Sequence, residues 1–172
     1  MLKITLDYNV LIYNEEGSTT LTAVEFQAIA DILDRPDLHC AVTAVIRRDN
    51  EADHDDARRH RLARRIASFP LVGQAPFRLD VSRLGGPDGL VSEAGKSLAS
   101  AIEAVLWSGG GLRNKRVSNR ATDVDHLLLH AQAARDVFVT YDRRMLDRRD
   151  ALAALGIQVA RASEVVHQLD DG

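Results

Sequence analysis

The chain contains very little cysteine, no long apolar run and no excess of positive charge. Cys40 is the only cysteine among 172 residues, so an intrachain disulfide is excluded. A single thiol fits a reducing compartment, and a free cysteine usually behaves as a small buried hydrophobe. No apolar stretch reaches the roughly 18 residues of a membrane-spanning helix, and the first residues lack the basic-then-apolar pattern of a secretory signal. We therefore expect a cytoplasmic protein.

The charge balance also limits the classes of partner. The net charge of -3 excludes a global positive field that would attract nucleic acid, so any such contact must use a local patch. Apolar residues make up 45% of the chain and charged residues 27%, which is typical of a folded globular protein and argues against disorder. Because the chain has no internal repeat or linker, we expect one domain over residues 1–172.

Short apolar segments alternate with stretches of helical periodicity. Segments rich in β-branched and aromatic residues predict strands at residues 2–6, 77–81, 137–140 and 157–160, and helical spacing predicts helices at 22–35, 49–68, 98–107, 122–131, 144–155 and 163–169. The run 40–46 fits either a strand or the start of a helix. This alternation indicates an α/β fold, a three-layer α/β/α sandwich with a central, mostly parallel sheet.

Two aspartates stand directly after predicted strands. Asp7 follows the first strand, and Asp142 follows the strand at 137–140. In an open α/β sheet, chemistry gathers beyond the carboxyl ends of the strands, so these carboxylates should approach each other. A divalent cation is the commonest way to keep such a cluster ionised. Each residue also has a structural explanation, since Asp7 and Asn9 are common in turns and Asp142 can cap a helix that starts at Arg143.

Further acids come from the middle of the chain. Asp123 and Asp125 lie in the first turn of the helix expected from Thr122, where the helix dipole favours negative charge. Asp125 can equally be the acid of a capping box begun by Thr122. Asp49 and Glu51 open the charged stretch at 49–68, and they are either a fourth acidic ligand or a solvated helix start.

At these residues the chain resembles the PIN-domain family of metal-dependent ribonucleases. Residues 4–12 are similar to the family's opening strand, in which the aspartate is followed two positions later by asparagine. Residues 125–131 look like its later helix beginning with an acid, and residues 137–142 look like its strand ending in Thr-x-Asp. The pieces occur in the family's order, and the resemblance extends over residues 1 to about 160.

The resemblance implies a set of site residues. Asp7, Asp125 and Asp142 would bind Mg²⁺ or Mn²⁺, and Asp49 and Asp123 would complete the shell or orient the attacking water. The resemblance also implies that Asn9 holds the Asp7 turn and that Thr140 does the same for Asp142.

The fourth acid departs from the family pattern. The family's remaining acid is usually a glutamate, six residues after a Ser or Thr that ends the second strand. Counting from Thr43 leads to Asp49, which is shorter by one methylene. Glu51 keeps the chemistry of that acid but shifts its register, so we prefer Asp49.

The resemblance further implies an endoribonuclease that hydrolyses RNA phosphodiester bonds. Members of this family that are toxins act with an antitoxin protein and form homodimers, so these partners are expected as well. Local positive charge lies in the expected loop 112–120, which would contact RNA phosphates through Arg113, Lys115, Arg116 and Arg120.

Three other functions remain open at this point. The missing glutamate favours a PIN-like module that binds RNA or protein with weak or no catalysis. A phosphotransfer enzyme would need a second aspartate where the chain has Asn9. His126 and His130 have the four-residue spacing of a zinc-binding helix, although no acid-rich zinc signature surrounds them.

Overall fold

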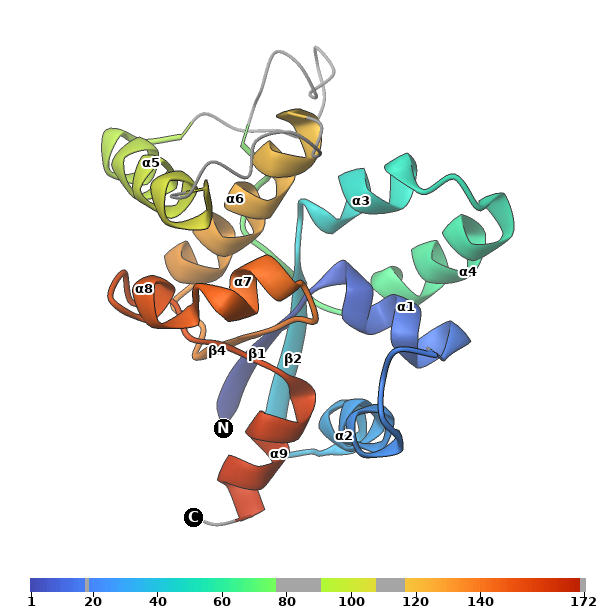
Figure 1. Cartoon of the computed structure of the whole chain (residues 1–172). Helices are drawn as coiled ribbons and strands as arrows, with labels where there is room; N and C mark the ends of the chain where they lie inside the picture. Colours follow the sequence, from blue (N-terminus) through green and yellow to red (C-terminus); the bar gives the residue numbers. More distant parts are fainter. Residues whose placement is uncertain (18, 77–90, 108–116, 171–172) are drawn as a thin grey trace.

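The computed structural model describes residues 1–17, 19–76, 91–107 and 117–170 (for 117–119, the backbone only). In this part of the chain, a five-stranded sheet with the order β3-β2-β1-β4-β5 lies between two layers of helices (Figure 1). Every pairing in the sheet is parallel, which confirms the expected α/β sandwich. The strands are β1 (Leu2–Leu6), β2 (Leu38–Thr43), β3 (Leu71–Val72), β4 (Val137–Val139) and β5 (Val159–Ala160).

Helices cover both faces of the sheet. One layer packs around a core shared by α1, α2, α3, α4 and α9, and the other packs around a core shared by α5, α6, α7 and α8 (Figure 1). None of the described helices is long and apolar enough to cross a membrane. The helices are α1 (Tyr8–Glu16), α2 (Ala23–Asp34), α3 (Ile46–Ala52), α4 (Asp56–Ala67), α5 (Glu93–Trp107), α6 (Val117–Gln132), α7 (Arg143–Asp147), α8 (Arg149–Ala153) and α9 (Ala162–Asp170).

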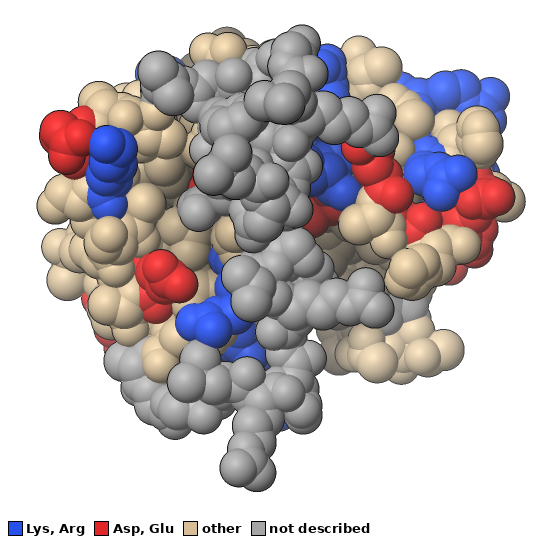
Figure 2. Space-filling model, turned by 90° about the horizontal axis from the view of Figure 1, so that it is seen from above, with Lys and Arg blue, Asp and Glu red and all other residues tan. Residues whose placement is uncertain are grey.

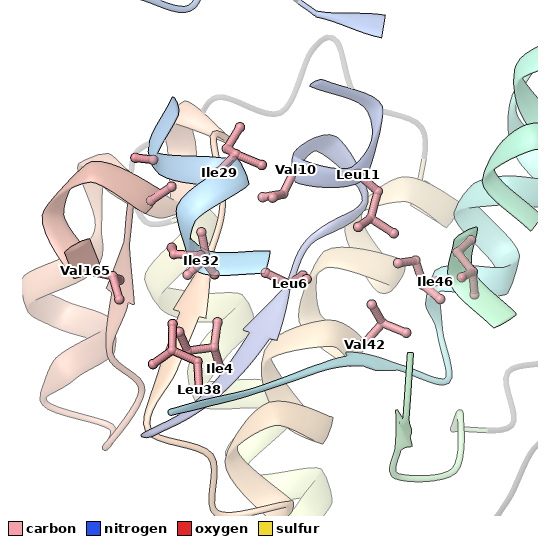
Figure 3. Close-up of a cluster of buried hydrophobic side chains, with 14 of the residues drawn as sticks. Ile4, Leu6, Val10, Leu11, Ile29, Ile32, Leu38, Val42, Ile46 and Val165 are labelled. Carbon is pink, nitrogen blue, oxygen red and sulfur yellow. The ribbon is translucent and has the colours of Figure 1, made fainter. Parts of the chain in front are cut away.

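The central strands bury both of their faces. Along β1, Ile4 and Leu6 point into the core beneath α2 and α9 (Figure 3), whereas Thr5 contacts His130 of α6 on the opposite face. On β4, Phe138 packs on the α6 side. Successive strand residues point to opposite faces, so a strand buried on both sides must be apolar almost throughout. This requirement explains the short apolar runs of the sequence.

Several boundaries differ from the sequence prediction. The run 40–46 divides, because β2 ends at Thr43 and α3 begins at Ile46. The charged stretch 49–68 is two helices, since Asp53 ends α3 and the Asp55 side chain caps α4 through the amide of Arg58. The stretch 144–155 is likewise two short helices, α7 and α8. The expected strand at 77–81 lies outside the described residues, and helix α1 and strand β3 were not anticipated.

Cys40 lies half-buried on β2 and packs against the core under α2. Its Sγ is 3.6 Å from the carbonyl oxygen of Ile32, to which the thiol donates. Burial raises the pKa of the thiol to about 11, so the thiol stays protonated at neutral pH. Cys40 therefore acts as the small apolar residue expected from the sequence.

The core beneath α2 should dominate stability. We expect Ile29→Ala, at a site that is 1% exposed, to lower the free energy of unfolding by about 2–5 kcal/mol, because it removes buried methyl groups and leaves a cavity. Urea denaturation measures this change. Val24→Ala on the same helix is the control, since Val24 is 69% exposed and should change stability by less than about 0.5 kcal/mol. Equal effects of the two variants would contradict the packing described here.

Candidate metal centre

Three side chains meet at the carboxyl edge of the sheet. Asp7 follows β1, Asp49 lies on α3 after β2, and His126 lies on α6, which packs over the opposite face. One ligand atom from each residue lies within 4.8 Å of the other two, so the three could hold a metal ion. Parallel strands end at a common edge, and this is how the fold brings together residues that are far apart in the sequence.

Asp7 is held from several directions. Its Oδ1 accepts a hydrogen bond of 2.7 Å from the amide of Tyr8, which caps α1. Its Oδ2 accepts hydrogen bonds from Asn9 Nδ2, at 2.7 Å, and from the hydroxyl of Thr140. The carboxylate is therefore fixed in orientation, and one of its oxygens lies within 4.8 Å of the ligand atoms of Asp49 and His126.

Asn9 and Thr140 also connect the ends of the two neighbouring strands. Asn9 Oδ1 accepts a hydrogen bond of 3.1 Å from the amide of Tyr141, and Thr140 Oγ1 accepts one of 2.9 Å from the amide of Asp142. Asn9 thus holds the turn after Asp7, and Thr140 holds the turn before Asp142. These are the local contacts that the resemblance implied for the two residues.

The environment of Asp7 disfavours its charge. Burial raises the pKa of this carboxyl above its ordinary value, and the nearby Asp49 carboxylate acts in the same direction. The charge of His126 and the hydrogen bond from Thr140 lower the pKa again, but the net shift is upward. A buried carboxyl that resists ionisation is stabilised as a carboxylate when a cation lies beside it.

The imidazole of His126 links the two helical layers. Its Nε2 lies 2.6 Å from Asp49 Oδ2, and its Nδ1 lies 2.6 Å from the hydroxyl of Thr43. The imidazole and the ring of Phe138 have an edge-to-face arrangement, with their centroids 6.2 Å apart. Burial lowers the pKa of this imidazole, but the negative charges of Asp49 and Asp7 outweigh it and raise the pKa to about 9.

Asp125 does not lie in the first turn of its helix, because α6 begins at Val117 rather than at Thr122. The expectation that Asp123 and Asp125 stand in the first turn of this helix is therefore wrong. The side chain of Asp125 is fully buried and forms an ion pair of 3.0 Å with Arg48, which also donates to the carbonyl oxygen of Pro76. This carboxylate joins α6 to α3 and is not part of the three-residue group.

The remaining predicted acids, Asp142, Asp123 and Glu51, are not members of the three-residue group. Asp142 caps α7, since its Oδ1 accepts hydrogen bonds from the amides of Arg144 and Met145. Asp123 is half-buried, and its charge helps to raise the pKa of His126. Glu51 is exposed and does not belong to the group. Of the acids predicted from the sequence, the structure thus brings together Asp7 and Asp49.

The predicted basic loop is mostly outside the described residues, as Arg113, Lys115 and Arg116 all lie there. Arg120 belongs to helix α6, where its guanidinium stacks on Trp107 and lies 3.7 Å from Glu103. Figure 2 views the molecule from the side to which the strands point, and acidic and basic side chains alternate on the described part of that face. Figure 2 therefore shows no separate basic patch on the described part of this face.

A polar network beside the site fixes α3 against α1. The hydroxyl of Tyr8 lies 3.2 Å from Asn50 Oδ1 and 3.0 Å from Asp53 Oδ2. Arg58 of α4 forms two hydrogen bonds of 2.6 Å with the carboxylate of Asp53. Tyr8 and Asn50 directly follow Asp7 and Asp49 in the sequence, so the network sets the separation of these two acids.

Sequence reasoning missed His126 as a member of the group. The four-residue spacing of His126 and His130 suggests a zinc pair, but of the two only His126 belongs to the group. His130 lies one turn further along the helix, where its Nδ1 bonds to Thr5 and its Nε2 has no hydrogen-bond partner among the described residues. No local pattern in the sequence distinguishes His126 from His130, because the site depends on packing between distant segments.

The pairing of His126 with Asp49 should make the metal-free protein sensitive to alkali. The pKa of His126 is about 9 in the folded chain, above the ordinary 6.5, so its contribution to stability is complete below about pH 6.5 and disappears as the pH rises through about 9. We expect the unfolding free energy in chelator to fall by roughly 3 kcal/mol across this interval. Urea titrations from pH 6 to pH 9.5 measure it. His126→Asn should remove most of the slope, and an unchanged slope would contradict the pairing.

The Asp125 carboxylate should contribute to stability rather than to metal binding. We expect Asp125→Asn to lower the unfolding free energy by about 3 kcal/mol, because it leaves Arg48 without its buried partner. Isothermal titration with Mn²⁺ should give an affinity within a few-fold of the wild type. Asp147→Asn is a matched control, since it breaks an exposed pair with Arg143 that contributes little. Loss of Mn²⁺ binding in Asp125→Asn alone would return this residue to the ligand set.

Comparison with known proteins adds no family assignment. No protein-family model matches the chain, and no curated protein matches its sequence. The grouping of Asp7, Asp49 and His126, and the motifs around Asp7 and Asp142, are therefore the features from which a function can be inferred.

Proposed function

We propose that the chain is a divalent-metal-dependent endoribonuclease of PIN type, which hydrolyses phosphodiester bonds in RNA. The observation that carries this proposal is the meeting of Asp7, Asp49 and His126 at the carboxyl edge of a parallel sheet. The acidic motifs that resemble the PIN family lie at the carboxyl ends of neighbouring strands, since Asp7 follows β1 and Asp142 follows β4.

The donor set fits a divalent cation. Two carboxylates and one imidazole, each within 4.8 Å of the others, offer the oxygen and nitrogen atoms that such ions take from proteins. Burial raises the pKa of Asp7, and a cation beside this carboxyl would favour its ionised form. A bound divalent ion supplies a water of lowered pKa and neutralises charge that builds up on a phosphate.

The residues of the chain then have separate tasks. Asp7 and Asp49 hold the ion, and Asn9 and Thr140 keep the Asp7 carboxylate in one orientation through their hydrogen bonds. Asp123 and Asp142 border the site, where carboxylates can orient a water. Fixed groups of this kind favour hydrolysis, because little reorganisation is needed when the reaction occurs.

The wider biological role extends this proposal. A toxin that is neutralised by an antitoxin, and a homodimeric state, follow from the resemblance of the motifs to the PIN family. No contact between described residues bears on either partner. Metal binding and cleavage of RNA are therefore the first properties to measure.

Asp7→Asn tests the proposed nuclease directly. The change keeps the shape of the side chain but removes its charge, so we expect cleavage of a labelled single-stranded RNA in Mn²⁺ to fall by at least about 100-fold. Mn²⁺ affinity should fall as well, while the circular dichroism spectrum stays that of the wild type. Gel analysis of the cleavage products and isothermal titration provide the two measurements.

The control is Asp147→Asn, an exposed aspartate in a surface ion pair, which should retain wild-type cleavage. If Asp7→Asn cleaves RNA as fast as wild type, a contaminating nuclease explains the activity and the proposal is wrong. If the wild type binds RNA but never cuts it in Mg²⁺ or Mn²⁺, the chain is a binding module instead.

A further inference from the structure

We propose that His126 is a metal ligand, so that the site prefers a first-row transition ion such as Mn²⁺, Fe²⁺ or Zn²⁺ over Mg²⁺. This inference rests on the proposed metal site and specifies which ion occupies it. It adds a nitrogen ligand to a site that the sequence motifs describe by carboxylates alone.

The position of Nε2 is the first argument. This atom lies 2.6 Å from Asp49 Oδ2, and one ring nitrogen of His126 lies within 4.8 Å of ligand oxygens of both Asp7 and Asp49. Any cation placed between these two carboxylates therefore meets the imidazole nitrogen as its next neighbour. The side chain of His126 is only 2% exposed, so it has no solvent-facing alternative in the described structure.

The orientation of the ring is the second argument. The Nδ1 atom lies 2.6 Å from the Thr43 hydroxyl, and Phe138 contacts the ring edge-on. Histidines that bind metals commonly have their other nitrogen held by a neighbouring oxygen, which fixes both the tautomer and the direction of the ligand atom. For coordination, Nδ1 keeps its proton and donates to Thr43, and the proton on Nε2 leaves to solvent.

Helix α6 carries a carboxylate and an imidazole on adjacent residues, Asp125 and His126. The carboxylate of Asp125 is fully buried and paired with Arg48. Asp125 is therefore engaged by Arg48, whereas His126, the next residue, belongs to the group. The helix contributes an imidazole nitrogen at the place where the sequence suggested a carboxylate oxygen.

Nitrogen ligation changes which ion is preferred. Mg²⁺ binds oxygen ligands and keeps several waters, whereas imidazole binds zinc, iron and nickel well. For a site that contains nitrogen, affinity should increase from Mn²⁺ through Fe²⁺ to Co²⁺ and Ni²⁺. An all-carboxylate site would discriminate much less between Mg²⁺ and Mn²⁺.

Pulsed electron paramagnetic resonance of the Mn²⁺-loaded full chain is the direct test. We expect spin-echo modulation from a directly bound nitrogen, and its frequency should change when histidine is labelled with ¹⁵N. His126→Asn should abolish the modulation, because the asparagine amide can still bond to Thr43 but cannot reach the metal. His54→Gln, which alters an exposed histidine on the α3–α4 turn, should leave the modulation unchanged.

Metal affinities provide the second measurement. In His126→Asn the Co²⁺ affinity should fall by roughly 10-fold or more, while the Mg²⁺ affinity changes by less than about threefold. Bound Mn²⁺ without nitrogen modulation in the wild type would overturn the inference and leave the proposed nuclease intact. Failure of the wild type to bind any of these ions would overturn both. If His126→Asn does not fold, the spectrum of the labelled wild type still decides between these outcomes.

Discussion

The contact between His126 and Asp49 joins all three layers of the fold at one point. His126 belongs to the helical layer on one side of the sheet, Asp49 belongs to the layer on the other side, and Thr43 at the end of β2 holds the imidazole between them. Buried charges are tolerated only when they are paired and hydrogen-bonded, so this contact also fixes where α3 and α6 can lie.

The architecture could be predicted from local patterns. Both faces of β1 and β4 are buried, and this condition produces apolar runs that are visible without a structure. The two aspartates that follow these strands were found for the same reason, because parallel strands end at a common edge. Asn9 and Thr140 lie within two residues of those aspartates, and their hydrogen bonds follow from that nearness.

The composition of the site was harder to predict, because it depends on packing between distant segments. The motif at residues 125–131 predicts Asp125 as a ligand because it begins with this acid. Its partner Arg48 is 77 residues away and on another helix. The start of α6 moved from Thr122 to Val117, which removed the argument from the first helical turn. His126 was visible only as half of a histidine pair, and no local pattern shows that it points between two carboxylates.

The network of Tyr8, Asp53 and Arg58 extends beyond the residues of the site. It anchors the outer helix α4 to the start of α1, next to the acids of the site, although α4 itself supplies no ligand. Substitutions on the surface of α4 can therefore tilt α3 and alter the spacing between Asp7 and Asp49. Arg58, a partly exposed residue of α4, therefore helps to position the acids of a site to which it contributes no ligand.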